Sequence, residues 1–407
     1  MEGAIPRLRA DLEIISTYYH GERALLIKDS LGLIHDPVIL QGEALNLLGL
    51  IDGKRNIRDI QLEIIRQRGG IFVSSESIEK LLSELEAAFL LEGENYSQAK
   101  DKLITEYSLL EKRLPSHAGL SYPAGREELS EYLNSLLSLG EEQSPALESK
   151  KISALIAPHI DLEAGKRVYA KAYQAIKNSS PKKVFLLGTG HHLMESYFSL
   201  TEKDFETPLG RVKTDRDLVR KLKRAGGKAT SSHDIAHYKE HSLEFELIFL
   251  QHLFGNSFSL VPCLCGSLEK ELERVSRPAE IPEVDSFLRT LKDDLKAHGS
   301  KTLVVAGVDF SHIGPKFGHS QRASSLLLDA KKHDRLLIEA ISKGDVEAFW
   351  LESRKVKDRY NVCGFSTLAS LLEIFPGAQG YLLDYEFWRE EPTQSAVSFA
   401  AIALESK

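Results

Sequence analysis

The most regular feature of the chain is a series of short, mainly apolar runs separated by stretches with helical periodicity. Such runs are typical of strands buried on both faces of a sheet. The predicted strands cover 152–156, 183–188, 258–264 and 302–308, with two more near 380–385 and 395–404. The predicted helices cover 163–177, 241–254, 283–297, 323–342, 345–354 and 364–374. Strands that alternate with helices predict an α/β fold with a mainly parallel sheet flanked by helices.

The N-terminal part of the chain follows a different pattern. Two alternating segments on either side of His20-Gly-Glu22 predict a hairpin over 12–19 and 24–29. Helical patterns follow near 42–50 and 57–68 and from Ser74 or Ser75, and 89–94 suggests a short wing. We therefore expect a small winged-helix-like α+β domain over 1–95. A charged helical linker follows over 96–115, and Pro115 marks its boundary with the α/β domain at 116–407.

DNA binding is the usual function of a winged helix, but the charges of this chain argue against it. The 407 residues carry a formal net charge of -7, so we expect no nucleic-acid partner. The small and apolar positions between Leu40 and Ile60 instead resemble the PqqD family. Members of that family bind peptides or act as docking domains for modifying enzymes. The resemblance covers about residues 10–95 and implies a peptide or protein partner.

Composition indicates a soluble protein of the cytoplasm. Three cysteines in this length do not make a disulfide framework, which favours a reducing compartment. No apolar run approaches the roughly 20 residues that span a bilayer, so we expect no membrane association. The N-terminus lacks the basic and apolar regions of a signal peptide.

Imidazole groups follow three of the predicted strands. His159 follows the strand at 152–156, and the pair His191-His192 follows the strand at 183–188. Asp309 and His312 follow the strand at 302–308. Open α/β sheets bind ligands at the carboxyl ends of their strands, so these side chains predict a metal site or an acid–base site. Neighbouring side chains on an extended segment point to opposite sides, and we expect only one of the histidine pair to face the site.

Cys363 lies at the start of a predicted helix, where the helix dipole favours a thiolate. A thiolate is a nucleophile or a soft metal ligand, and a small buried hydrophobe is the ordinary alternative. A hydrolase that pairs Cys363 with a histidine is a further alternative, although the sequence has no oxyanion motif. Cys263 and Cys265 share one face of a predicted strand and are interpreted as core residues.

A rival zinc site is suggested by His233, His237 and His241, whose spacing of four would align them on one helical face. The residues around His233 have the composition of a loop, so one continuous helix is not expected. We expect only His241, with Glu244 one turn later, to face the main site.

A series of motifs over 116–405 resembles the Memo family, also called protein B of the AmmeMemoRadiSam system. In chain order they are His117-Ala-Gly, Tyr122-Pro, Ala157-Pro-His159, Leu187-Gly-Thr-Gly-His-His192, Thr207-Pro-Leu-Gly210, Glu240-His-Ser-Leu-Glu244, Val261-Pro with Gly266, Val308-Asp-Phe-Ser-His312 and Cys363-Gly364. The resemblance implies a fold like that of the class III, LigB-type extradiol dioxygenases, which use non-haem iron. Glu246 departs from the family pattern, which commonly has histidine or glutamine at this position, and so do Leu120-Ser121 and Ile160-Asp161.

The same resemblance implies a set of site residues. His159, His191 and Cys363 correspond to the ligands of iron(II) or copper, and imidazole with thiolate suits these metals. Asp309, His312 and His241 correspond to pocket residues, with His312 at the acid–base position of the dioxygenases. The resemblance thus implies a metal-binding protein that is redox active or a dioxygenase-like oxidoreductase. Its N-terminal domain would dock a partner such as a radical-SAM enzyme. The alternative is a non-enzymatic binding or adaptor protein with a vestigial dioxygenase pocket.

Overall fold

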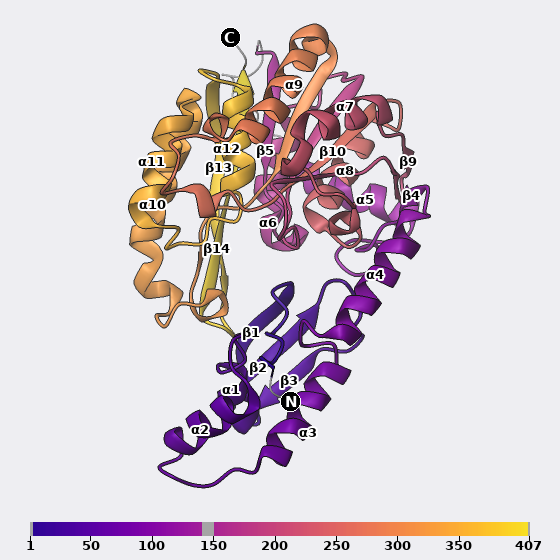
Figure 1. Ribbon diagram of the computed structural model, residues 1–407. Helices are drawn as coiled ribbons and strands as arrows, with labels where there is room; N and C mark the ends of the chain where they lie inside the picture. Colours follow the sequence, from indigo (N-terminus) through magenta and orange to yellow (C-terminus); the bar gives the residue numbers. More distant parts are fainter. Residues whose placement is uncertain (1–2, 141–149, 406–407) are drawn as a thin grey trace. The chain divides into compact units, whose positions relative to one another are not determined.

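The computed structural model describes residues 3–140 and 150–405 and divides into two compact units, Met1–Leu109 and Leu110–Lys407 (Figure 1). Pro115, where the sequence predicts the domain boundary, lies inside the second unit. Within the described residues, no helix has the length and apolar character needed to cross a membrane.

The first unit packs four helices with a three-stranded antiparallel sheet of order β1-β2-β3. Its strands are β1 Leu12–Tyr19, β2 Glu22–Asp29 and β3 Val38–Gln41. Its helices are α1 Glu43–Leu48, α2 Ile57–Gln67, α3 Ser75–Ala87 and α4 Glu94–Ser108. The predicted hairpin is confirmed, because His20 and Gly21 both have positive φ and close a two-residue turn between β1 and β2. Ser74 accepts a hydrogen bond from the Ser77 amide and caps α3, as predicted.

The wing predicted at 89–94 is not confirmed. Instead of folding as a hairpin, this segment pairs with the start of the chain, where Leu8 and Leu91 form an isolated antiparallel bridge. The buried Arg9 guanidinium holds the segment in place by donating to the Phe89 carbonyl at 2.9 Å. The same guanidinium is paired with the Asp29 carboxylate at 2.8 Å. These long-range partners are not visible in the local pattern from which the wing was predicted.

The second unit is organised around an eight-stranded sheet of order β12-β14-β5-β11-β6-β10-β7, with β13 paired to β14. The strands are β5 Ile152–Ala157, β6 Lys183–Thr189, β7 Phe198–Leu200, β10 Ser259–Cys265, β11 Thr302–Gly307, β12 His312–Ile313, β13 Gln379–Glu390 and β14 Ser395–Glu405. A second, three-stranded sheet joins β4 Lys112–Arg113, β8 Asp204–Thr207 and β9 Gly210–Val212.

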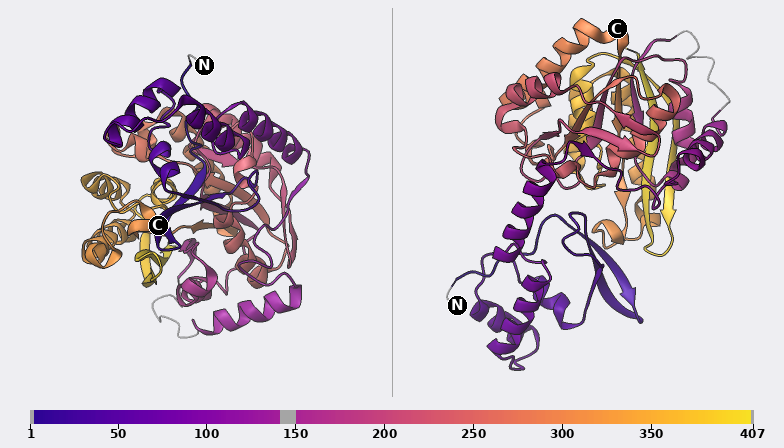
Figure 2. Two further views of the ribbon diagram at one scale, coloured as in Figure 1. Left: turned by 90° about the horizontal axis from the view of Figure 1, so that it is seen from below. Right: turned by 90° about the vertical axis from the view of Figure 1, so that its right-hand side faces the viewer.

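The large sheet is mixed, which corrects the prediction of a mainly parallel one. Its centre, β5-β11-β6-β10, is parallel, whereas β7, β12, β13 and β14 are all paired antiparallel. The short connection between β13 and β14 explains the antiparallel pairing of these two strands, because a few residues can join antiparallel strands but not parallel ones. Figure 2 shows this long hairpin, in yellow, on one side of the unit.

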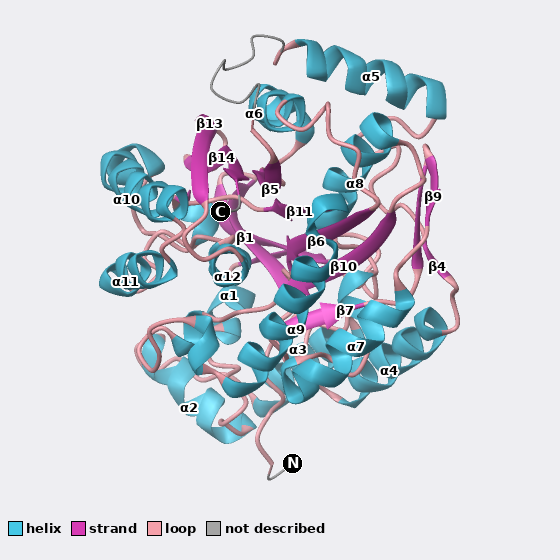
Figure 3. Cartoon of the chain, turned by 90° about the horizontal axis from the view of Figure 1, so that it is seen from above, coloured by secondary structure: helices cyan, strands magenta, loops and turns pink. Residues whose placement is uncertain are grey.

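Helices cover both faces of the large sheet (Figure 3). One face packs against α6 Leu162–Gln174 and α8 His241–Phe254, with α5 Arg126–Ser138 outside them. The other face packs against α7 Arg216–Gly226, α9 Pro282–His298, α10 Ala323–Lys343, α11 Val346–Val356 and α12 Phe365–Ile374. Successive residues of one strand enter opposite cores: Leu186 packs with α8, whereas Phe185 and Leu187 pack on the other side. The predicted helices from 163 onward are present, whereas α7 was not predicted.

A buried ion pair ties the segment before α5 to α8. The Arg113 guanidinium and the Glu244 carboxylate are paired, and both side chains are almost fully buried. Glu244 also accepts hydrogen bonds from the amides of Ser116 and His117 and from the Tyr122 hydroxyl. Burial by itself would raise the pKa of Glu244, but Arg113 and these donors lower it to about 2. Glu244 therefore stays charged and fixes the chain that borders the amino end of α8.

A second buried acid lies on the same helix. Glu246 is fully buried and accepts a hydrogen bond from the Tyr173 hydroxyl. Burial raises the pKa of Glu246 well above its ordinary value. Its carboxyl lies close beneath Gly307, the last residue of β11. Glu246 is therefore a neutral acid packed directly under the end of the central strand.

Replacement of Glu244 by alanine should leave the buried Arg113 charge without its partner. We expect Glu244→Ala to lower the free energy of unfolding by about 3–5 kcal/mol. The measurement is denaturant unfolding followed by tryptophan fluorescence, since both tryptophans, Trp350 and Trp388, belong to the second unit. The control is Glu339→Ala, which removes an exposed ion pair with Lys343 and should leave stability almost unchanged. Equal effects of the two variants would contradict the buried ion pair.

The neutral state of Glu246 predicts a pH dependence. A raised pKa means that the folded chain holds a proton that the unfolded chain releases above about pH 4.5, so stability falls as the pH rises past this value. Glutamine has no such proton. The melting temperature of Glu246→Gln should therefore fall less than that of the parent between about pH 5 and pH 8. Asp309 and Asp334 also have raised pKa values but are common to both proteins. If the melting temperatures of the two proteins fell equally over this pH range, a neutral Glu246 would be excluded.

Candidate metal centre

The predicted strand ends meet at one edge of the sheet. Strand β11 pairs in parallel with β5 and with β6, and Gly307 lies opposite Ala157 on one side and Gly188 on the other. Because the three strands end at the same level, the residues that follow them are neighbours. The ring centroids of His159 and His191 are 5.0 Å apart. The structure thus brings together the side chains that the sequence placed at separate strand ends.

Cys363 joins this group from a distant part of the chain. Its Sγ lies 3.4 Å from the Nε2 of His159, and one donor atom each from His159, His191 and Cys363 lie within 4.8 Å of one another. Gly364 permits the approach, because a Cβ at this position would lie 2.7 Å from the Asp309 carbonyl oxygen. Cys363 is therefore held against the end of β11 by the turn that leads into α12.

The amino end of α8 forms the other wall of the group. Glu240 caps this helix and is 3 % exposed. Its carboxylate lies 3.0 Å from the Nδ1 of His191 and 3.3 Å from the Nδ1 of His241, and it also accepts from the His191 amide. The helix comes this close because Gly307 has no side chain, as a Cβ there would lie 2.4 Å from the Ser242 carbonyl oxygen. The Glu240 carboxylate thus orients two imidazoles, in each case through the Nδ1 atom of the ring.

Burial keeps the imidazoles neutral. It lowers the pKa of His159 to about 3, with a further contribution from His191, and it lowers the pKa of His241 well below its ordinary value. The Nδ1 of His159 lies 3.0 Å from the Gly307 carbonyl oxygen, so Nδ1 carries the proton and Nε2 faces Cys363. Neutral imidazole is the form that binds a metal ion.

The expected thiolate is not favoured in the metal-free protein. Burial raises the pKa of Cys363 well above its ordinary value, and the neighbouring Asp309 carboxylate adds to the effect. These effects outweigh the helix end from which a thiolate was predicted. A bound cation reverses this balance, because a coordinating thiol is deprotonated.

Asp309 and His312 border the same group. Asp309 accepts a hydrogen bond from the His159 amide at 3.1 Å, and its Oδ2 lies 3.7 Å from the Nε2 of that histidine. His312 begins β12, where its Nδ1 lies 3.0 Å from the Phe310 carbonyl oxygen. Its charge lowers the pKa of Asp309, although burial has the larger effect and raises that pKa to about 6.

The donor set fits a soft or borderline metal ion. Two imidazoles and a thiol lie within one coordination sphere of each other, and such nitrogen and sulfur donors suit iron, copper or zinc rather than magnesium or calcium. A second set, His191, Glu240 and His241, also meets this distance. The rings of His191 and His241 are stacked, however, with an interplanar angle of 15°. The Nδ1 atoms of both rings already face the same Glu240 oxygen, so we interpret Glu240 as a partner that orients the imidazoles.

The rival zinc site is absent from the part of the chain that the structure describes. His237 belongs to a short 3-10 turn, Ile235–His237, whereas His241 begins α8, so the two do not share a helical face. The Nε2 of His237 lies 3.1 Å from the Ser199 carbonyl oxygen. Glu244, which was expected to face the main site, instead pairs with the buried guanidinium of Arg113. Cys263 and Cys265 are core residues, as predicted.

Sequence reasoning missed the role of Glu240. The signal for it in the sequence is the position of Glu240 directly before His241 at a predicted helix start. His117 was missed in the same way. Its ring lies 5.7 Å from that of His241, centroid to centroid, and it contacts Phe245.

Comparison with known proteins identifies relatives over most of the chain. The family described as "Memo-like protein" matches residues 113–403. A MEMO1 family protein of Aquifex aeolicus is 32% identical over 389 residues, which are 93% of this chain and 95% of that protein. One from Thermus thermophilus is 27% identical over 354 residues, covering 86% and 99% of the two chains.

A solved structure gives a weaker likeness. The protein titled "Crystal structure of uncharacterized protein JW3007 from Escherichia coli K12" covers 61% of this chain and 98% of its own, with a TM-score of 0.35 and 11% identity. The family match and the Aquifex relative both span the strand ends, α8 and Cys363 described above. On these two findings, the chain belongs to the Memo family.

Proposed function

We propose that this protein binds iron or copper through His159, His191 and Cys363. The observation that supports the proposal is the convergence of their three donor atoms within 4.8 Å. The sequence separation of these residues makes the convergence a property of the fold rather than of a local motif. Burial keeps His159 neutral and ready to bind, whereas the Cys363 thiol must lose its proton when the metal binds.

Bound iron or copper would supply one-electron redox chemistry to the pocket. The surrounding residues then have separate roles. Glu240 orients His191 and His241 through their Nδ1 atoms. Asp309 fixes the backbone that carries His159. His312 is our candidate for the group that moves a proton to or from a substrate, and His241 lines the pocket beside the metal ligands. We propose an oxidoreductase of dioxygenase-like type on this basis.

A non-enzymatic binding protein is the second candidate. The specific observation in its favour is the cysteine among the three donors, because the extradiol dioxygenases that the sequence resembles use a carboxylate in place of a thiolate. Oxygen consumption with catechol-type substrates separates the two candidates. Turnover by the metal-loaded protein supports the enzyme, and metal binding without oxygen uptake supports the binding protein.

We further propose that the first unit docks a peptide or protein partner. A radical-SAM enzyme is the candidate implied by the resemblance to the AmmeMemoRadiSam system. Support comes from a cavity among the helices of this unit. The residues that line it include Asn46 and Leu47 of α1.

Loss of any one donor should empty the metal centre. We expect anaerobically purified protein to hold about one equivalent of iron or copper. Each single variant should lose it, because two donors alone hold a metal ion weakly. The variants are His159→Ala, His191→Ala and Cys363→Ala. The measurement is elemental analysis of the four proteins with circular dichroism to establish folding. His298→Ala, which removes an exposed histidine of α9, is the control and should keep the metal. Unchanged stoichiometry in a folded variant would remove that residue from the ligand set.

Glu240→Gln should weaken the metal site without removing a ligand. Glutamine keeps the size of the side chain but loses the charge that orients both imidazoles, so metal affinity should fall about 10–100-fold. Competition with a chromophoric chelator measures the affinity. The matched control is Glu352→Gln on α11, where the carboxylate pairs only with the surface residue Lys355 among the contacts described. Equal affinity of Glu240→Gln and the parent would show that Glu240 only caps α8.

A further inference from the structure

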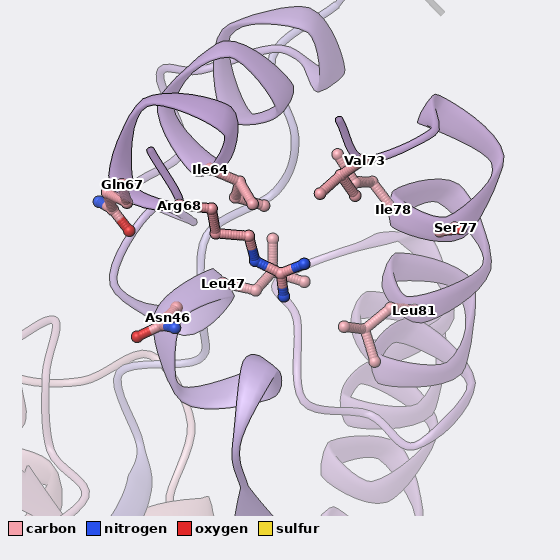
Figure 4. A pocket seen from close by; sticks show the side chains of 9 residues that line it. All are labelled: Asn46, Leu47, Ile64, Gln67, Arg68, Val73, Ser77, Ile78 and Leu81. Atoms are coloured by element: carbon pink, nitrogen blue, oxygen red, sulfur yellow. The ribbon is translucent and has the colours of Figure 1, made fainter. Parts of the chain in front are cut away.

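The first unit contains a small cavity whose walls are mainly apolar. It has a volume of about 100 Å³ and lies among α1, α2 and α3. Figure 4 shows Leu47 from α1, Ile64 from α2, and Ile78 and Leu81 from α3 around it. The two α3 residues are one helical turn apart and present one continuous apolar wall. A cavity of this size accepts one aliphatic side chain of a ligand.

A cationic group enters this apolar cavity. Arg68, the residue that ends α2, extends its guanidinium toward the middle of the cavity, between the helices (Figure 4). The surrounding sequence is locally basic, because residues 54–68 contain five basic and two acidic side chains, in a chain whose net charge is negative. A guanidinium beside apolar walls is complementary to a carboxylate that accompanies an apolar group.

Apolar surface continues beyond the cavity along the loop that closes it. Ile71 and Phe72 are 64% and 73% exposed and directly precede Val73, which lines the cavity. The loop is held at this point, since the Gln61 side-chain amide donates to the Val73 carbonyl at 2.7 Å. A ligand seated in the cavity therefore has further apolar contacts in one direction, which favours a continuing peptide segment over a chain end.

We propose that this cavity, with Arg68 and the Ile71–Phe72 edge, binds a peptide segment of a partner protein in which leucine-like residues are followed by acidic side chains. One aliphatic side chain fills the cavity, and the neighbouring carboxylate pairs with Arg68. A second apolar residue covers Phe72. The inference rests on the docking role proposed above for the first unit and names the chemistry of the segment that it recognises.

The test uses the full-length protein and fluorescein-labelled peptides in an anisotropy titration. The probe is the peptide amide Gly-Ser-Leu-Asp-Leu-Asp-Ser-Gly. One comparison peptide has lysine in place of both aspartates, and another, Gly-Ser-Leu-Ser-Leu, has a free carboxyl terminus as its only carboxylate. Arg68→Gln removes the cation, and Ser77→Phe fills the cavity from an exposed position on α3. Arg66→Gln is the control, because Arg66 is exposed and pairs with Glu63 outside the cavity.

We expect the aspartate peptide to bind and the lysine peptide to bind at least about tenfold more weakly. Arg68→Gln and Ser77→Phe should each weaken binding of the aspartate peptide by about tenfold or more, whereas Arg66→Gln should not. Tighter binding of the free-carboxylate peptide would overturn the internal-segment assignment. If both variants bound the aspartate peptide as tightly as the parent, the cavity would not be the binding site, but the docking role of the first unit would stand. Failure of all three peptides to bind at about 1 mM would contradict both proposals.

Discussion

The register of three parallel strands is the constraint on which the candidate site depends. Strand β11 lies between β5 and β6, and its last residue, Gly307, is level with the ends of both neighbours. A shift of one residue would turn each following side chain to the opposite face. The register is fixed because both faces of these strands are buried under helices. The apolar packing of the whole sheet thus determines the positions of the imidazoles that follow the strands.

The electrostatics of the site follow from burial. His159 and His241 lose their positive charge when they are buried, whereas the pKa of Glu240 is held well below its ordinary value by the imidazoles around it, although burial opposes this. The metal-free group therefore combines the Glu240 carboxylate with the neutral rings of His159 and His241. A bound cation would add to the compensation of the buried Glu240 charge and would let Cys363 ionise. The charge of Glu240 and the chemistry of the donor atoms thus both favour a bound metal cation.

The sequence predicted what local patterns determine and missed what tertiary packing determines. His159 and His191 could be placed at strand ends because apolar runs predict buried strands, and Cys363 could be added only through the resemblance to a family. Glu240 could not be assigned, because its role arises only when α8 packs against Gly307. The wing failed for the same reason, since its segment pairs with residues at the far end of the unit. The mixed sheet could not be predicted either, because the strand pattern does not specify the direction in which β7, β12 and β14 pair with their neighbours.

The number of donors bears on what such a centre does. Structural sites are usually closed by four protein ligands, whereas catalytic sites have three and keep a position open. The proposed centre would have His159, His191 and Cys363 as direct donors, while Glu240 lies 3.0 Å and 3.3 Å from the Nδ1 atoms of two imidazoles. His241, whose ring lies 5.1 Å from that of His159, then borders the open position rather than filling it. A centre built only to stabilise the fold has no need of this arrangement. The geometry therefore favours a site that exchanges ligands over one that only holds a metal.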